Sequence, residues 1–195
     1  MRHLPLLAVL LLAGCEPEPS VGSYRVPREG AVAVAPATRA EARPAMPASP
    51  EMVAAAAKEG SPSFPAAPAG WTAKDPGAMR KGSWSVGPAD AAADLAVTVF
   101  PGDVGGRVAN FNRWRQQLGL PAATAEAFDA IQIAKVGPLQ GEVVHFTSAD
   151  GAKATRAVLV AHKGSTWFFK LTGPAATVRS ASDAFDAFVA ATQLP

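Results

Sequence analysis

Cysteine is nearly absent from this sequence, since Cys15 is the only one among 195 residues. A single cysteine excludes an intramolecular disulfide, a cysteine zinc cluster and a thiol-disulfide pair. Charged residues are also scarce, at 17% of the chain, and the formal net charge is only +2. A nucleic-acid-binding protein shows a concentrated basic face, so we expect no nucleic-acid partner.

A run of apolar residues long enough to cross a membrane is missing from the N-terminus. The run from Leu4 to Leu12 contains nine residues, which reach about 14 Å as a helix, whereas the hydrocarbon core of a bilayer is about 30 Å thick. Arg2 and His3 precede this run, and small residues follow it. A charged start, a short apolar stretch and small residues are typical of a secretory signal peptide.

The end of this signal resembles a known processing site. Residues Leu11-Leu12-Ala13-Gly14-Cys15 resemble the lipobox of bacterial lipoproteins. The resemblance implies that residues 1–14 are removed and that Cys15 receives acyl chains such as palmitate, which would hold the protein on a bilayer. Glu16, in place of the Asp used in enteric sorting, favours the outer membrane if the organism has one. The alternative is that Cys15 is an ordinary residue beside a conventional cleavage site.

Proline is unusually frequent in the next segment, with ten prolines between Glu16 and Gly70. Proline removes backbone donors and fixes φ, so residues 15–70 are expected to form a disordered tether. One local exception is a short helix over residues 49–58, where Ser49 can cap the helix and Pro50 suits its first turn.

The remaining residues, 71–195, hold all four tryptophans and eight of the nine phenylalanines, which indicates a single globular domain. Apolar alternation and helical spacing predict an α+β fold, mainly an antiparallel sheet packed by two or more helices. Hairpin signals lie at Ala149-Asp150-Gly151 and Lys163-Gly164, and residues 123–133 fit a short helix or an edge strand. Expected strands cover 78–86, 94–100, 142–147, 154–162 and 165–172, and expected helices cover 105–118 and the residues after Gly173-Pro174.

The C-terminal part of this pattern resembles a known fold. Trp167-Phe168-Phe169-Lys170-Leu171-Thr172-Gly173-Pro174, followed by a helix with paired phenylalanines, resembles the end of the PsbP-like α/β/α sandwich. The opening Pro68-Ala69-Gly70-Trp71 fits the same outline, and residues 105–121 are similar to a segment of uncharacterised bacterial lipoproteins. The resemblance implies the fold and carries no catalytic residues to this chain.

Residues able to perform chemistry are few. The chain beyond the signal has two histidines, His145 and His162, without a nucleophile motif such as Gly-x-Ser-x-Gly. We therefore expect no enzyme activity, no cofactor and no metal, although a hydrolase using either histidine, or a zinc site completed by Asp150 or Glu142, stays open. The loop Gly102-Asp103-Val104-Gly105-Gly106 is expected to be a strand-to-helix turn, with an anion site as the alternative.

The most distinctive polar surface lies on the expected helix 105–118. Tryptophan beside arginine is the composition of a binding hot spot. The alternative is structural: Trp114 packs on the sheet while its arginines pair with acids such as Asp94 or Asp129. Arg156 and Lys170, on neighbouring strands, either extend the surface or keep it soluble. The candidate interaction residues are Asn110, Asn112, Arg113, Trp114, Arg115, Gln116 and Gln117.

These observations predict a membrane-anchored envelope lipoprotein that faces the periplasm or the exterior and has a non-enzymatic interaction or accessory role. Its expected partners are the bilayer, through acylated Cys15, and an envelope protein. The alternative function is a small-ligand carrier or sensor that uses a groove between sheet and helix, lined by Trp84, Trp114 and Trp167.

Overall fold

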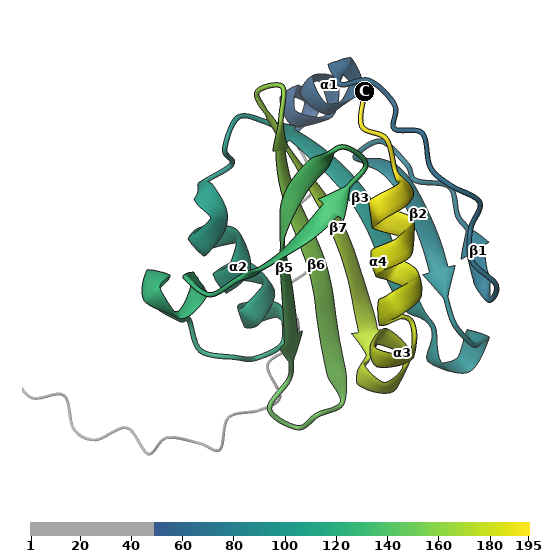
Figure 1. Cartoon of the computed structure of the whole chain (residues 1–195), viewed down its shortest axis with the longest axis vertical. Helices are drawn as coiled ribbons and strands as arrows, with labels where there is room; N and C mark the ends of the chain where they lie inside the picture. Colours follow the sequence, from purple (N-terminus) through teal and green to yellow (C-terminus); the bar gives the residue numbers. More distant parts are fainter. Residues whose placement is uncertain (1–48) are drawn as a thin grey trace, which may run out of the picture. The chain divides into compact units, whose positions relative to one another are not determined.

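The computed structural model describes residues 49–195, which form an antiparallel sheet with helices on both of its faces (Figure 1). The strands lie in the order β1-β2-β3-β7-β6-β5-β4. The expected α+β fold with an antiparallel sheet is therefore confirmed. The strands are β1 (Trp71–Ala73), β2 (Arg80–Val86), β3 (Ala93–Pro101), β4 (Gln132–Val136), β5 (Leu139–Thr147), β6 (Lys153–His162) and β7 (Ser165–Pro174). The helices are α1 (Pro50–Lys58), α2 (Gly106–Gln117), α3 (Ala175–Ser180) and α4 (Ser182–Ala191), with 3-10 turns at Ala89–Ala91 and Ala125–Phe128.

Strand β7 lies at the centre of the sheet and joins two strand groups. On one side it pairs with β3, with Leu171 opposite Leu95, and on the other with β6, with Phe169 opposite Val158. The predicted hairpin turns are present between β5 and β6 and between β6 and β7. In the second turn, Lys163 and Gly164 both have positive φ, at 49° and 77°.

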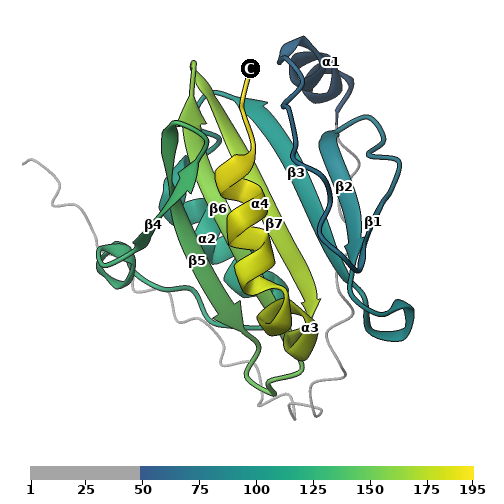
Figure 2. The same ribbon diagram turned by 45° about the vertical axis from the view of Figure 1, so that its right-hand side comes forward.

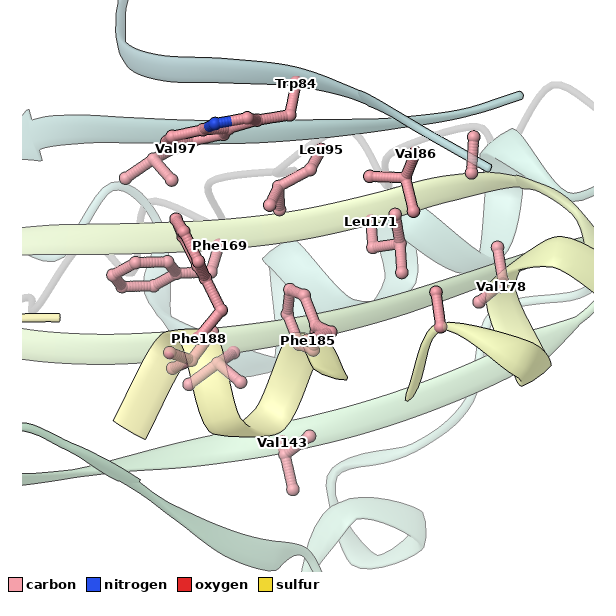
Figure 3. Packing of buried hydrophobic residues seen from close by; sticks show 14 of the residues in the cluster. Trp84, Val86, Leu95, Val97, Val143, Phe169, Leu171, Val178, Phe185 and Phe188 are labelled. Carbon is pink, nitrogen blue, oxygen red and sulfur yellow. The ribbon is translucent and has the colours of Figure 1, made fainter. Parts of the chain in front are cut away.

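One face of the sheet carries the larger apolar core, and α3 and α4 cover it (Figures 2 and 3). Phe185 and Phe188 of α4 lie over Phe169 and Leu171 of β7, and the side chains interdigitate (Figure 3). Phe185 and Leu171 are completely buried. The apolar residues of the C-terminal helix therefore face the sheet, as their spacing predicts.

The C-terminal helix nevertheless differs from the expected continuous helix. It is divided at Ala181, which separates α3 from α4. The hydroxyl groups of Ser180 and Ser182 donate hydrogen bonds to the carbonyls of Thr177 (3.0 Å) and Val178 (2.8 Å). Such side-chain bonds to preceding carbonyls bend helices, which accounts for the break at this position.

Helix α2 covers the opposite face of the sheet, as the two views in Figures 1 and 2 show. Phe111, Trp114 and Leu118 are buried at the predicted helical spacing. Arg107 fastens the start of α2 to the sheet, because its guanidinium group donates to the Glu142 carboxylate (2.8 Å) and to the Phe128 carbonyl (2.9 Å). A second, smaller apolar core lies between α2 and strands β5 to β7.

The sequence predicts that the folded domain starts at Trp71, and in the structure the residues from α1 to Gly70 also pack against the sheet. Helix α1 forms as predicted, with the Met52 amide donating to the Ser49 hydroxyl (3.3 Å). Ala56 is only 1% exposed, and the Glu59 carboxylate accepts a hydrogen bond from Ser165 (2.8 Å). The prolines stop residues 59–70 from forming regular structure, but they do not prevent close packing.

We name residues 59–70 the N-terminal strap. Ser63 exchanges two backbone hydrogen bonds of 2.9 Å with Gln193. Phe64 packs edge-on against Trp84 at 5.0 Å and stacks on Phe188 at 5.8 Å between ring centroids. The strap therefore closes one side of the larger core and ties it to the C-terminal residues.

The predictions for the signal peptide, Cys15 and most of the tether fall on residues 1–48 and lie outside the described residues. Among residues 49–195, the helices are too short or too polar to cross a bilayer.

Candidate functional site

Several polar residues of the predicted interaction surface are turned inward. Asn110 is only 2% exposed, and its amide donates to the carbonyls of Gly106 (2.8 Å) and Val104 (3.3 Å). Asn112 makes two hydrogen bonds with the backbone of Ala123, at 2.8 and 2.9 Å. These two asparagines hold the loops at either end of α2, and neither side chain is free for a partner.

Trp114 and Arg115 also have intramolecular contacts. Trp114 is buried and meets Phe168 of β7 edge-on, with ring centroids 5.8 Å apart. The Arg115 guanidinium lies 5.5 Å from the Phe146 ring centroid and donates to the Pro121 carbonyl (2.9 Å). The arginines do not pair with Asp94 or Asp129 as the structural alternative expected; the packing of Trp114 on the sheet does occur.

Three residues of the predicted surface are exposed: Arg113, Gln116 and Gln117. Arg113 donates to the Asn110 side-chain oxygen (2.7 Å), and Gln117 accepts a hydrogen bond from the Lys170 amine (3.1 Å). Arg113 and Gln117 therefore face the region between α2 and the sheet.

A pocket of about 310 Å³ lies between α2 and the part of the sheet that α2 leaves uncovered. Three cationic side chains line it: Arg80 from β2, Arg113 from α2 and Lys170 from β7. Asp94 of β3 is the one carboxylate among the lining residues, and the aromatic wall is formed by Phe100, Trp114 and Phe168. We refer to this site as the α2 pocket.

The strand register explains why these side chains meet. Ala96 of β3 lies opposite Lys170, and Asp94 lies opposite Thr172. Alternate residues of a strand point to the same face, so these residues form a patch on the α2 face. Arg80 lies opposite Thr98, and the pairing shifts between Arg80 and Gly82. This β-bulge brings Arg80 to the α2 face, whereas simple alternation would place it with Trp84 on the other face.

The Asp94 carboxylate is already committed to neighbouring cations. It forms ion pairs with Lys74 and with Arg80, whose Nη1 lies 3.0 Å from Oδ2. Burial favours the neutral carboxyl, but the hydrogen bonds and charges of Lys74 and Arg80 outweigh burial and hold the pKa of Asp94 below its ordinary value. Asp94 is therefore an anion that orients Arg80.

Lys170, unlike Arg80, pairs with no carboxylate among residues 49–195. Burial lowers the pKa of its amine, Arg80 and Arg113 lower it further, and Asp94 acts in the opposite direction. Its hydrogen-bond acceptor is the neutral amide of Gln117. Within residues 49–195, neither Lys170 nor Arg113 forms an ion pair with a carboxylate.

The groove expected from three tryptophans is not formed. Trp84 and Trp167 belong to the core beneath α4, whereas Trp114 belongs to the core beneath α2 on the other face. A groove between sheet and helix does exist as the α2 pocket, but Trp114 is the only one of these three tryptophans that lines it. Arg156 does not extend it, because its guanidinium pairs with Asp186 of α4, with Nε 2.8 Å from Oδ1.

The two histidines lie apart from the α2 pocket. His145 Nε2 lies 3.4 Å from the Thr147 hydroxyl, and burial together with Arg156 and Arg179 lowers its pKa. His162 Nε2 lies 3.0 Å from the Pro195 carbonyl oxygen. In the described part of the chain, no three potential metal ligands among His, Cys, Asp and Glu gather at one place.

The glycine-rich loop before α2 forms a turn, as expected. Gly105 has φ of 86° and Gly106 has φ of 80°, values that glycine adopts readily. The Asn110 amide holds two carbonyls of this turn.

No family model and no curated protein sequence matches the chain. Several solved structures are similar to it at low identity, among them the following three. A Bacteroides thetaiotaomicron protein is 15% identical over 70% of this chain, with a TM-score of 0.41, and this chain spans only 49% of that protein. Cyanobacterial PsbP (CyanoP) from Synechocystis is 13% identical, with a TM-score of 0.42, over 66% of this chain and 84% of its own. LpqN, involved in cell envelope biogenesis of Mycobacterium tuberculosis, is 14% identical, with a TM-score of 0.40, over 70% and 86% of the two chains. Similarities this low assign neither a family nor a function.

Proposed function

We propose that this chain is a membrane-anchored, non-enzymatic binding protein of the cell envelope, and that its domain captures an envelope partner through the α2 pocket. The observation that carries the proposal is the convergence of Arg80, Arg113 and Lys170, from three separate elements, on one aromatic-walled pocket. Arginine beside aromatic rings is the composition that dominates binding energy at protein interfaces. Holding the domain at a membrane raises its effective concentration near other envelope proteins.

The anchor in this proposal is Cys15, within the lipobox-like Leu11-Leu12-Ala13-Gly14-Cys15. Two or three acyl chains bind a bilayer durably, because each buried methylene contributes about 0.8 kcal/mol. Replacing Cys15 by serine is therefore expected to remove lipid labelling by a radioactive fatty acid and to release most of the chain from the membrane fraction. Unchanged labelling of Cys15→Ser would contradict the proposed anchor.

Partner capture is tested by two matched arginine substitutions on α2. Arg113→Ala is expected to lower capture of the partner by about fivefold or more, because Arg113 faces the α2 pocket. Arg115→Ala is expected to leave capture unchanged, because Arg115 is held against Phe146 and Pro121. The measurement is in-cell crosslinking of the tagged full chain, followed by affinity purification and quantitative mass spectrometry.

The background control is a chain that ends at residue 48, because the strap and α1 belong to the domain. Both arginine variants are also compared with the parent chain by thermal unfolding. Equal loss of capture in Arg113→Ala and Arg115→Ala, or no loss in either, would contradict a role of the α2 pocket in partner binding.

A second candidate function is a carrier or sensor of a small ligand. The observation that favours it is the volume of the α2 pocket, about 310 Å³, which lies at the lower end of the range of small-molecule sites. Native mass spectrometry of the purified chain is expected to show a retained ligand in this case.

A further inference from the structure

We infer that the α2 pocket recognises an organic anion, in which a carboxylate or similar acidic group is attached to an apolar, ring-sized body. This inference rests on the proposed binding role of the pocket and names the chemistry of the group that enters it. The acidic group can belong to a free small acid or to the end of a partner's chain, and the same recognition serves both.

The first support is the imbalance of charge among the lining residues. Arg80, Arg113 and Lys170 are cationic, and Asp94 is the one carboxylate that lines the pocket. Asp94 already pairs with Arg80 and with Lys74, which approaches from outside the pocket lining. Charged groups in a partly buried site need compensation, and a bound anion supplies it.

The second support is the state of the two cations that face the pocket without an acidic partner. Arg113 donates to the Asn110 side chain and Lys170 donates to the Gln117 side chain, both of which are neutral amides. A guanidinium group has five N–H donors and an ammonium group has three, so both retain donors for a ligand. Burial and the neighbouring guanidinium groups already lower the pKa of Lys170, and an anion beside the amine would reverse this effect.

The third support is the shape and polarity of the wall. Phe168 meets Trp114 edge-on at 5.8 Å and Phe100 at 6.0 Å between ring centroids, and Ala96 leaves space beside Lys170 on the neighbouring strand. An inorganic anion alone would leave most of about 310 Å³ unfilled. An apolar body against this wall removes apolar surface from water, while the acidic group meets the cations.

The test compares two probes with the same body. N-acetylphenylalanine carries a carboxylate, and N-acetylphenylalanine amide replaces that carboxylate with a neutral group. Isothermal titration calorimetry on the full chain, purified from membranes in mild detergent, is expected to show the acid binding about tenfold tighter than the amide or more, an energy difference of about 1.4 kcal/mol. Raising the salt concentration is expected to reduce this preference.

Two substitutions locate the preference in the α2 pocket. Lys170→Met and Arg113→Ala are each expected to reduce the ratio of acid to amide affinity to about twofold or less, whereas Lys153→Met, an exposed lysine outside the pocket lining, leaves it unchanged. Lys170→Met is expected to fold at least as well as the parent chain, because methionine replaces a charged amine in a partly buried position. A thermal unfolding curve of each variant confirms that it is folded.

The two sources of the acidic group are separated by benzoate. Displacement of bound N-acetylphenylalanine by benzoate supports a free small acid, and displacement only by acids with an amide linkage supports a chain terminus.

Equal affinity for the acid and the amide, or no binding of any acid at concentrations on the order of 1 mM, would overturn the inference. Loss of acid preference in Arg113→Ala with unchanged partner capture would leave the inference standing and contradict the proposed function. Loss of partner capture in Arg113→Ala, together with equal affinity of the parent chain for the acid and the amide, would contradict the inference and leave the proposed function standing.

Discussion

Replacing Phe64 by alanine is expected to lower the free energy of unfolding by about 3 kcal/mol, which corresponds to a fall in melting temperature of about 10 °C. Phe64 belongs to the N-terminal strap and fills the space between Trp84 and Phe188, with ring centroids 5.0 and 5.8 Å away. A Cβ placed on Gly82 would come within 3.0 Å of Phe64 Cε2 and closer still to the Trp84 ring. The ring is thus closely fitted, and its removal leaves a cavity.

The measurement is thermal or urea unfolding of the full chain, followed by circular dichroism. Met52→Ala provides the control, because Met52 precedes the strap on α1 and is 42% exposed, so its removal is expected to change stability by about 0.5 kcal/mol or less. Equal melting temperatures for Phe64→Ala and the parent chain would show that residues 59–70 are the unpacked tether expected from their proline content.

Replacing Trp114 by alanine is expected to cost about 4 kcal/mol of folding stability. Trp114 is 5% exposed and contacts two rings, Phe111 with centroids 5.6 Å apart and Phe168 at 5.8 Å. It therefore links α2 to β7. Trp114→Phe is expected to cost less than half as much, because an aromatic ring still occupies the site.

Urea unfolding of both variants measures this effect, and Arg113→Ala serves as the control on the same helix. Arg113 is exposed, so its removal is expected to change stability by about 0.5 kcal/mol or less. An unchanged unfolding midpoint for Trp114→Ala, combined with lost partner capture, would show that Trp114 acts as a contact residue rather than as part of the core.

The spacing of apolar residues predicted most of the helices and strands, because an element that buries one face against the sheet repeats its apolar residues with a helical or a strand period. Phe111 and Trp114 on α2, Leu118 directly after it, and Phe185 and Phe188 on α4 are buried as their spacing predicts. The N-terminal strap was missed because the apolar residues within its twelve positions, 59–70, follow neither a helical nor a strand period. The one signal available was Phe64 itself, the only phenylalanine outside residues 71–195.

The site was predicted less well, because polar contacts depend on distant backbone. Asn112 bonds to Ala123, eleven positions further along the chain, and composition does not reveal such a bond. Arg80 reaches the α2 pocket through a β-bulge, which reverses the alternation used to assign faces. Arg113 was identified from the sequence because it lies beside Trp114 on the expected helix. Lys170 was named as a cation on a neighbouring strand, and the sequence left open whether it extends the surface or only keeps it soluble.

The central position of β7 has a kinetic consequence. Asp94 of β3 pairs with Thr172 of β7, so the two strand groups join only when the last strand of the chain takes its place. Until residues 165–174 take their place between them, β3 and β6 each present an unpaired edge, and such an edge is a template for aggregation. Pairing over such long sequence separations is slow, because loop closure must precede the stabilising contacts. Sheet completion is therefore a late event in folding, and the edges of β3 and β6 stay exposed until β7 pairs with both.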